Sequence, residues 1–248
     1  MKYDFDKVVD RHGTNCLKYD FAIERGKPAD ILPLWVADMD FQTAPAILER
    51  LEETVKHGIF GYSDGKEGYF AAVQNWYRER FGWETKPEWL VKTPGVVFEL
   101  AAAVRAYTKE GEGVLLQQPV YYPFSEVIAD NGRRVVSSTL VLGDDNRYHM
   151  DVADFEEKLK AENVKLFFLC NPHNPVGRVW TREELERVAE ICLKYNVTWM
   201  VDEMHCDFIF PGHTFTSCMN LDEKYRKILA LYSSPGKTFN VAGFQPAN

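Results

Sequence analysis

Short apolar runs alternate with an amphipathic stretch in the second half of the chain. Residues 165–170 and 197–201 are mostly apolar runs, which is typical of strands buried on both faces of a parallel sheet. Between them, Thr-Arg-Glu-Glu at residues 181–184 is a capping box, which predicts a helix running to about Tyr195. Residues 228–232 form a third apolar run. Strand, helix and strand at these spacings predict an α/β fold with a mostly parallel sheet.

The first half of the chain is mainly helical by the same reading. Predicted helices cover residues 43–57, 68–81 and 98–109. The first is expected to be capped by Thr43, with Pro45 in its first turn, and the third follows a turn at Gly95. Predicted β segments cover residues 114–116 and 134–142, followed by a turn at 143–146.

Composition narrows the class of protein. The chain has 248 residues, of which 46% are hydrophobic, and this length and content suffice for a large core. A net charge of −8 argues against a general nucleic-acid or anionic-membrane binder. The sequence has no run of 18 or more apolar residues, so we predict no membrane-spanning helix. The first six residues lack the apolar stretch of a signal peptide. The five cysteines are odd in number and widely spaced, so we expect reduced thiols in a cytoplasmic protein.

Three segments that follow predicted strands carry site-like chemistry. They are Asn-Pro-His-Asn-Pro-Val-Gly at 171–177, Asp-Glu-Met-His at 202–205 and Ser-Pro-Gly-Lys at 234–237. Because ligands of open α/β sheets bind beyond the carboxyl ends of the strands, these segments are expected to meet at one edge.

Each segment also has a simpler explanation. The first could be only a tight turn, since Asn, Pro and Gly are turn residues. Asp202 could be a helix cap or an ion-pair partner, and a lone lysine after a strand is usually a solvated surface charge. Asp202, His205 and Asp207 could instead suggest a metal site, but their spacing is loose and a further ligand would have to come from elsewhere.

Taken together, an amide, a carboxylate and an amine at three strand ends match the needs of pyridoxal phosphate. The amine forms a Schiff base with the cofactor's aldehyde. The carboxylate keeps the pyridine nitrogen protonated, and the amide donates a hydrogen bond to the phenolate oxygen. Small residues and backbone N–H groups at a turn before a helix hold the phosphate.

The same segments resemble a known family. Residues 35–41 (Trp-Val-Ala-Asp-Met-Asp-Phe), 94–97, 171–177, 201–205 and 234–243 resemble the class I/II, fold-type I aminotransferase superfamily in order and spacing. Within it, the first and last motifs look most like the cystathionine β-lyase (C–S lyase) branch, the MalY/PatB family. This resemblance implies a three-layer α/β/α cofactor-binding domain over residues 46–248, incomplete at its C-terminal end, and an N-terminal piece of a smaller domain over residues 1–45.

The resemblance also implies roles for single residues. Lys237 would hold the cofactor covalently and act in catalysis, and Asp202 would pair with the pyridine nitrogen. Asn174 and His205 would contact the phenolate side, and Tyr121 would stack on the ring, although core packing is the simpler explanation for an isolated tyrosine. The phosphate would be held by Val96, Val97, Ser234 and, from the neighbouring subunit of a homodimer, Tyr62. The substrate side would include Trp35, Ala37 and Asp38.

Two features depart from the wider superfamily. Gln245 lies in the stretch where many aminotransferases place a phosphate-binding arginine, which fits the lyase branch better. Family members also continue well past the lysine motif, adding sheet strands, most of the small domain and an arginine for the substrate carboxylate. We therefore expect a C-terminally truncated chain whose exposed sheet edges promote association or are covered by a partner.

The implied activity is β-elimination from L-cystathionine or a related cysteine S-conjugate, giving a thiol, pyruvate and ammonia. Two alternatives stay open at this point: an amino-acid aminotransferase, and a non-catalytic truncated or regulatory protein. The resemblance implies a small-molecule amino-acid substrate and a homodimer, and the composition predicts no nucleic-acid or membrane partner.

Overall fold

The computed structural model describes residues 3–248, and its chain falls into two compact units. Unit 1 runs up to Tyr62 and also includes Pro235–Phe244. Unit 2 comprises Ser63–Ser234 and Gln245–Asn248. The domain boundary predicted at residue 45 stays a prediction.

A five-stranded parallel sheet forms the centre of unit 2, in the order β2-β1-β5-β6-β7. Its strands are β1 (Gly113–Leu116), β2 (Arg134–Ser137), β5 (Leu166–Cys170), β6 (Thr198–Asp202) and β7 (Leu229–Tyr232). A separate antiparallel hairpin is formed by β3 (Val141–Leu142) and β4 (Tyr148–His149). The predicted α/β fold class with a parallel sheet is confirmed.

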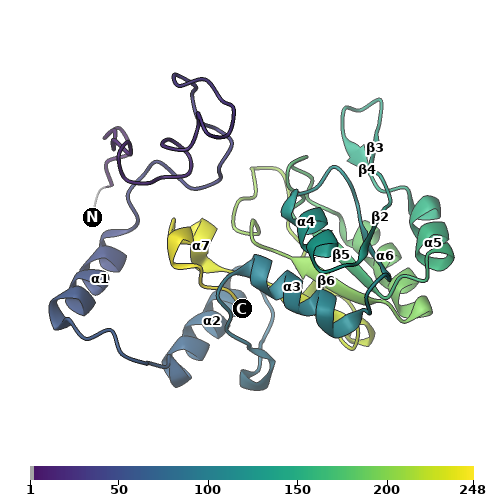
Figure 1. Cartoon of the computed structure of the whole chain (residues 1–248). Coiled ribbons are helices and arrows are strands. Elements are labelled where there is room, and N and C mark those ends of the chain that lie inside the picture. The colour runs from purple at the N-terminus through teal and green to yellow at the C-terminus, as the bar shows by residue number, and fades with distance from the viewer. Residues whose placement is uncertain (1–2) are drawn as a thin grey trace. The chain divides into compact units, whose positions relative to one another are not determined.

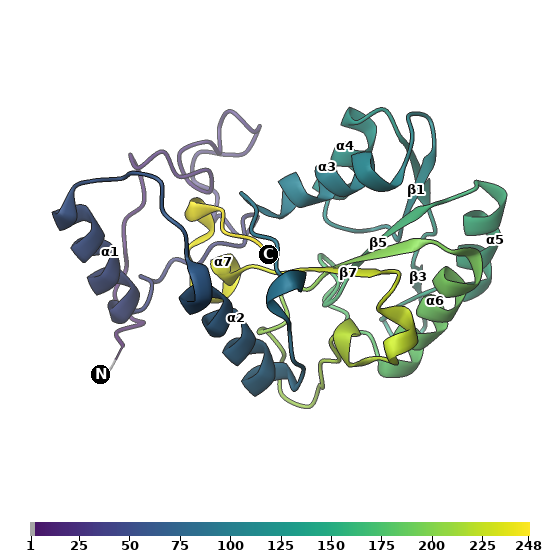
Figure 2. The same cartoon turned by 90° about the horizontal axis from the view of Figure 1, so that it is seen from below.

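Helices cover both faces of the sheet, which makes unit 2 a three-layer α/β/α structure (Figures 1 and 2). One face carries α3 (Val96–Tyr107) and α4 (Pro123–Asp130), and the other carries α5 (Val152–Ala161) and α6 (Arg182–Tyr195). The remaining helix of this unit is α2 (Lys66–Phe81). Single 3-10 turns occur at Pro87–Trp89, Cys218–Asn220 and Glu223–Tyr225.

Alternating side chains of the strands build two cores, because neighbouring residues of a strand point to opposite faces. Leu115 and Phe167 pack with α5 and α6, whereas Val114 and Phe168 pack with α3 and α4. All four are essentially inaccessible to solvent. Burial on both faces explains why the strands read as continuous apolar runs in the sequence.

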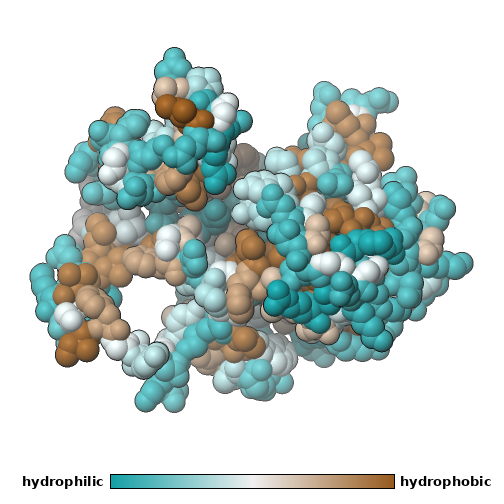
Figure 3. Space-filling view, viewed as in Figure 1, coloured by the Kyte–Doolittle hydropathy of each residue, from teal (hydrophilic) through white to brown (hydrophobic). Residues whose placement is uncertain are grey.

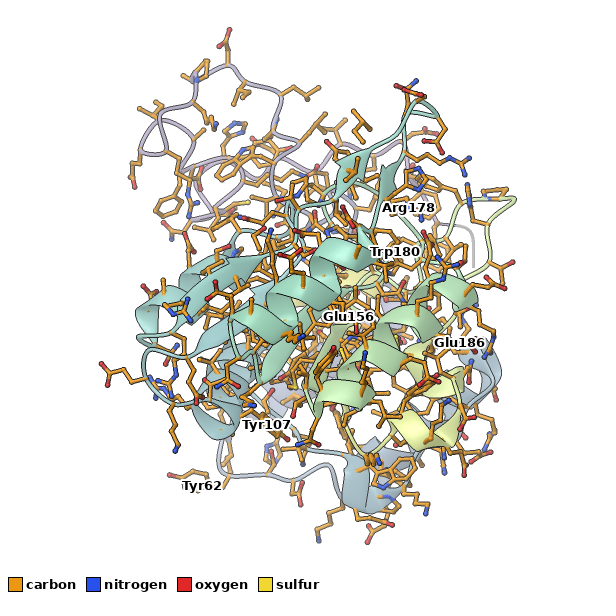
Figure 4. The ribbon with its side chains drawn as sticks, turned by 90° about the vertical axis from the view of Figure 1, so that its right-hand side faces the viewer. Tyr62, Tyr107, Glu156, Arg178, Trp180 and Glu186 are labelled. Atoms are coloured by element: carbon orange, nitrogen blue, oxygen red, sulfur yellow. The ribbon has the colours of Figure 1, made fainter. Side chains whose placement is uncertain are left out.

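Polar contacts fix α5 and α6, the two helices that share one face of the sheet. The predicted capping box is confirmed, with Thr181 and Glu184 bonding each other's backbone N–H groups at the start of α6. The side chain of Asp151 caps α5. Glu156 of α5, visible with Glu186 in Figure 4, accepts hydrogen bonds from Lys194 (2.7 Å) and Tyr195 (2.9 Å) at the end of α6.

Some predicted elements differ from the structure. Thr43 does not cap α1 (Pro45–His57), because its hydroxyl donates to the carbonyl of Phe239 at 2.6 Å and Ala44 occupies the cap position. Residues 134–142 do not form one strand but divide between β2 and β3. Helices α4 and α5 were not predicted at all.

Unit 1 contains α1, the one-turn helix α7 (Pro235–Thr238), the 3-10 turn Ala242–Phe244 and long irregular segments. No residue of α1 is buried. Its surface is partly apolar in Figure 3, as is that of the β3–β4 hairpin of unit 2, and exposed side chains include Leu48, Val55, Val141 and Leu142.

A cavity of about 500 Å³ lies in unit 2 beside β7, lined mainly by apolar side chains. Glu99, on the first turn of α3, places a buried carboxyl in its wall. Thr93 donates a hydrogen bond to Oε1, and Oε2 has no hydrogen-bond partner among the described residues. Burial raises the pKa of Glu99 to about 7, helped by the charge of Asp202 and opposed by the bond from Thr93.

We expect Phe167→Ala to lower the free energy of unfolding by about 3–5 kcal/mol, because it opens a cavity in the closed core. Phe167 is fully buried and packs edge-on against Phe155, with ring centroids 4.9 Å apart. Phe210→Ala is the matched control, because that ring is 80% exposed and its loss should cost less than about 0.5 kcal/mol. Denaturant unfolding measures both, and equal effects would contradict the assignment of the core.

We expect Glu99→Gln to stabilise the protein at pH 8. Between pH 4.5, the ordinary pKa, and pH 7, the folded protein holds a proton on Glu99 that the unfolded chain releases. The free energy of unfolding therefore falls as pH rises through this window, and Gln, which mimics the protonated acid, avoids that loss. The gain should be on the order of 2–3 kcal/mol at pH 8 and shrink toward pH 4.5. Denaturant unfolding at several pH values checks this, with the exposed Glu157→Gln as control; a gain that does not depend on pH would contradict it.

Candidate active site

Asp202 ends β6 in the middle of the carboxyl edge of the sheet. In the strand register it lies between Cys170 of β5 and Tyr232 of β7. Asp202 is buried, with 6% of its surface exposed, and its Oδ1 accepts the backbone N–H of Met204 at 2.9 Å. The backbone carbonyl of Asp202 accepts from Asn171 at 2.9 Å. A carboxylate is thus held in one orientation at the strand end, where a ligand of an α/β sheet binds.

The loop after β5 brings Tyr121 and Asn174 together. The backbone N–H of Tyr121 donates to the carbonyl of Asn174 at 2.9 Å, which joins this loop to the one after β1. The N–H of Asn174 in turn points to the sulfur of Cys170 at 3.4 Å. The Tyr121 ring is 36% exposed, so it is not the core residue that a lone tyrosine would suggest. Burial, then Tyr122 and the charge of Asp202, raise the pKa of its phenol.

His173 and Trp180 hold the same loop in place from inside. His173 Nε2 lies 2.9 Å from the carbonyl of Pro119, and the Trp180 indole N–H donates to the carbonyl of Cys170 at 3.0 Å. Burial lowers the pKa of His173 to about 4, so the ring is neutral at pH 7. These two rings meet edge to face.

Arg178 closes the loop on its outer side. Its guanidinium lies 4.7 Å from the centre of the Trp180 ring, and the two labelled side chains are neighbours in Figure 4. The same guanidinium pairs with Glu184, the residue that completes the capping box of α6. The loop geometry is therefore tied to the start of that helix.

Asn174 and His205 line a second cavity, of about 570 Å³, on unit 2. Asn174 comes from the loop after β5 and His205 from the loop after β6. Their predicted contacts with the phenolate side of a cofactor stay predictions.

The start of α3 offers backbone donors. Gly95 precedes the helix with φ +102°, a conformation that residues with a side chain rarely adopt. No side chain caps this helix, so the backbone N–H groups of Val96 and Val97 are not hydrogen-bonded to a capping side chain. Gln245 lies against this turn, since a Cβ added to Gly95 would be 3.6 Å from the Cβ of Gln245.

Residues 245–248 connect the turn before α3 to the end of β7. Thr93 and Ala247 exchange two backbone hydrogen bonds, at 2.9 and 3.2 Å. Ser233 and Asn248 exchange two more, at 3.1 and 2.9 Å. This bridge keeps the predicted phosphate-binding turn beside the strand end that leads to Ser234, and the sequence offered no sign of it.

The other predicted site residues belong to unit 1. Lys237 lies on α7, three residues after Ser234 along the chain. Trp35, Ala37 and Asp38 lie in the irregular segment before α1, and Tyr62 is fully exposed. The carboxylate of Asp38 is paired with Arg11.

Sequence reasoning missed several groups near the site. Glu99 could have been found as the one charged residue on the apolar face of the alanine-rich helix, one turn before Ala103. His173 lies inside the motif at 171–177, but its packing against Trp180 was not predicted. Among residues 3–248, no cluster of three His, Cys, Asp or Glu is arranged to hold a metal ion, and no helix has the length and apolar character of a membrane span.

Comparison with known proteins places these features in a family. Residues 29–245 match the family described as aminotransferase class I and II. Over 242 residues the chain is 43% identical to "Cystathionine beta-lyase PatB" of Bacillus subtilis, covering 98% of this chain and 62% of that protein. It is 36% identical to "Protein MalY" of Escherichia coli, covering 96% and 60%.

Solved structures give the same picture. The crystal structure of cystalysin from Treponema denticola, which contains pyridoxal 5'-phosphate, matches with a TM-score of 0.93 and 35% identity over 100% of this chain and 63% of that one. The PLP-bound C–S lyase from Staphylococcus hominis matches with a TM-score of 0.91 and 31% identity over the same shares.

The chain spans about three fifths of the length of the curated relatives it matches. The match nevertheless covers most of this chain, and it includes the strand ends and the lysine turn described above. The chain belongs to the class I and II aminotransferase family.

Proposed function

We propose that this protein is a pyridoxal-phosphate-dependent carbon–sulfur lyase that acts on L-cystathionine or related cysteine S-conjugates. The observation that carries the proposal is the fixed, buried Asp202 carboxylate at the central strand end, with Tyr121 and Asn174 joined on the neighbouring loops. The names of the relatives support the lyase branch.

The residues of unit 2 fit this cofactor. A negative charge at Asp202 suits a protonated pyridine nitrogen, and the uncapped start of α3 suits a phosphate. The partly exposed ring of Tyr121 suits stacking. Pyridoxal phosphate, when bound, supplies an aldehyde that captures amino groups and a ring that stores the electron pair left on the substrate's α carbon.

Each side chain then has a defined task. Asp202 would keep the ring nitrogen protonated, while Val96, Val97 and Ser234 would donate hydrogen bonds to the phosphate. Asn174 and His205 would orient the phenolate side, and Trp35, Ala37 and Asp38 would line the substrate side. Because the Asp38 carboxylate is paired with Arg11, we expect Asp38 to position the backbone of this segment and not to contact the substrate through its carboxylate.

Lys237 would carry the covalent attachment and then act as the base. Its Nζ lone pair would take the proton from the substrate's α carbon, after which the sulfur substituent leaves the β carbon. The overall reaction converts cystathionine and water into homocysteine, pyruvate and ammonia.

Transamination is the second candidate. The family description and the 39%-identical structure of a PLP-bound putative aminotransferase from Clostridium difficile favour it. The same side chains serve both reactions, which differ in whether the proton returns to the cofactor carbon. Pyruvate and thiol release from cystathionine distinguishes the lyase.

We further propose a cytoplasmic homodimer. All five cysteines are free thiols, which suits a reducing compartment. The exposed apolar side chains on and after α1, including Val55, Ile59 and Phe60, would be covered by the second copy, beside the exposed Tyr62.

We expect Lys237→Ala to abolish covalent cofactor binding, because the amine that attaches it is gone. With the full chain and pyridoxal phosphate, borohydride reduction should label the peptide that contains Lys237, as read by mass spectrometry. Pyruvate release from cystathionine should fall by about 10²–10⁴-fold or more in the variant. Lys227→Ala, an exposed lysine in the turn before β7, is the matched control and should behave as wild type. Labelling elsewhere, or none in the wild type, would refute the proposal.

We expect Phe60→Lys to shift the protein from dimer to monomer in sedimentation equilibrium, because it places a charge on the proposed interface. Phe60 is 74% exposed, so its replacement should not disturb folding. Phe210→Lys is the control, since that ring is equally open at 80% but lies in unit 2. A wild-type monomer at all concentrations would count against the dimer.

A further inference from the structure

Asn240 lies three residues after Lys237, at the point where the chain turns back from α7. Its φ of +53° is left-handed, a region that Asn tolerates better than most residues. Its N–H faces the carbonyl of Lys237 at 3.4 Å, and the next N–H, of Val241, donates to Gly236 at 2.9 Å. A helix of one turn has little stability of its own, so the orientation of Lys237 must be fixed by other contacts.

The side-chain amide of Asn240 supplies such contacts. Its Oδ1 accepts the N–H of Met39 at 3.0 Å. Its Nδ2 donates to the carbonyls of Met39 at 3.1 Å and Phe41 at 2.8 Å. The amide thus pairs with this segment as a neighbouring strand would, using both its donor and its acceptor. Aspartate lacks the donors and glycine lacks the whole group.

A network of ion pairs fixes the segment around Met39, to which Asn240 is hydrogen-bonded. Arg11 pairs with Asp38 and, at 2.8 Å, with Asp40. Lys18, whose side chain is 5% exposed, reaches Asp40 at 2.7 Å and the carbonyl of Asp38 at 3.0 Å. Burial of Asp40 acts to raise its pKa, but the bonds from Lys18 and Arg11 outweigh that and lower it. Two cations and two carboxylates therefore fix the backbone from Asp38 to Asp40.

We propose that Asn240 is a positioning residue: it docks the turn that carries Lys237 onto the charge-braced segment 39–41 and so sets the direction of the lysine amine. All of these residues belong to unit 1, and the hydroxyl of Thr43 adds a bond to Phe239. The amine has to reach the cofactor and later the substrate's α proton, and both steps are sensitive to small displacements. This role rests on the proposed function of Lys237.

Asn240→Gly is the informative variant, because glycine keeps the left-handed backbone and removes only the amide. Asn196→Gly is the matched control. Asn196 has φ +52° at the end of α6 and is exposed, with no side-chain hydrogen bond recorded in the described chain. Asn240→Asp, which keeps the acceptor for Met39 and loses both donors, separates the two halves of the amide.

Hydrogen exchange of the full chain without cofactor gives the first measurement. In Asn240→Gly the amides of Met39 and Val241 should exchange about tenfold faster, while Asn240→Asp should retain most of the protection at Met39. The control should match the wild type. Unchanged exchange at both amides would overturn the docking role.

The rate of pyridoxal phosphate attachment, followed by absorbance, gives the second measurement. It should fall about tenfold in Asn240→Gly and Asn240→Asp at a temperature where both variants are fully folded, because a misplaced amine attacks the aldehyde more slowly. Attachment at the wild-type rate in both variants would overturn the positioning role. If the wild type itself takes up no cofactor, the proposed function fails, while the exchange data still decide whether Asn240 docks the turn.

Discussion

The parallel hydrogen-bond ladder of β5, β6 and β7 is the constraint on which the candidate site depends. It brings Cys170, Asp202 and Tyr232 level with one another, so the loops that follow start from a common edge. β5 is buried along its whole length and β6 along most of it, and a slip of one residue would turn their core side chains to the wrong face. The end of β6, which carries Asp202, is therefore fixed by strand pairing and by the apolar packing of the two cores.

The elements that sequence reasoning found are those with strong local signals. Buried parallel strands appear as apolar runs, and the capping box at Thr181 states where α6 begins. Helix α5 was not predicted, although Asp151 caps it and Phe155 and Leu159 have helical spacing. Thr43 was misassigned because the true acceptor of its hydroxyl, Phe239, is almost two hundred positions away.

The candidate site divides in the same way. Asp202, Asn174 and Lys237 could be named as candidates from motifs, since each lies at or shortly after the end of a strand and its chemistry follows from the residue type. The groups that hold them could not. Asn240 reads as an ordinary turn residue until its partners Met39 and Phe41 are known, and residues 245–248 read as a tail until their bonds to Thr93 and Ser233 are seen. Long-range hydrogen bonds leave little trace in a single sequence.

The carboxylate of Glu184 makes two separate interactions, and these restrict which substitutions relatives of this chain can carry. One carboxylate oxygen accepts the N–H of Thr181 and the other pairs with Arg178. Replacing Arg178 by a neutral residue leaves a partly buried carboxylate without its cation, whereas replacing Glu184 removes both the partner of Arg178 and one half of the capping box. The substitutions are therefore unequal in cost, and drift in the loop is constrained by the helix. Positions 178 and 184 are expected to covary across homologues.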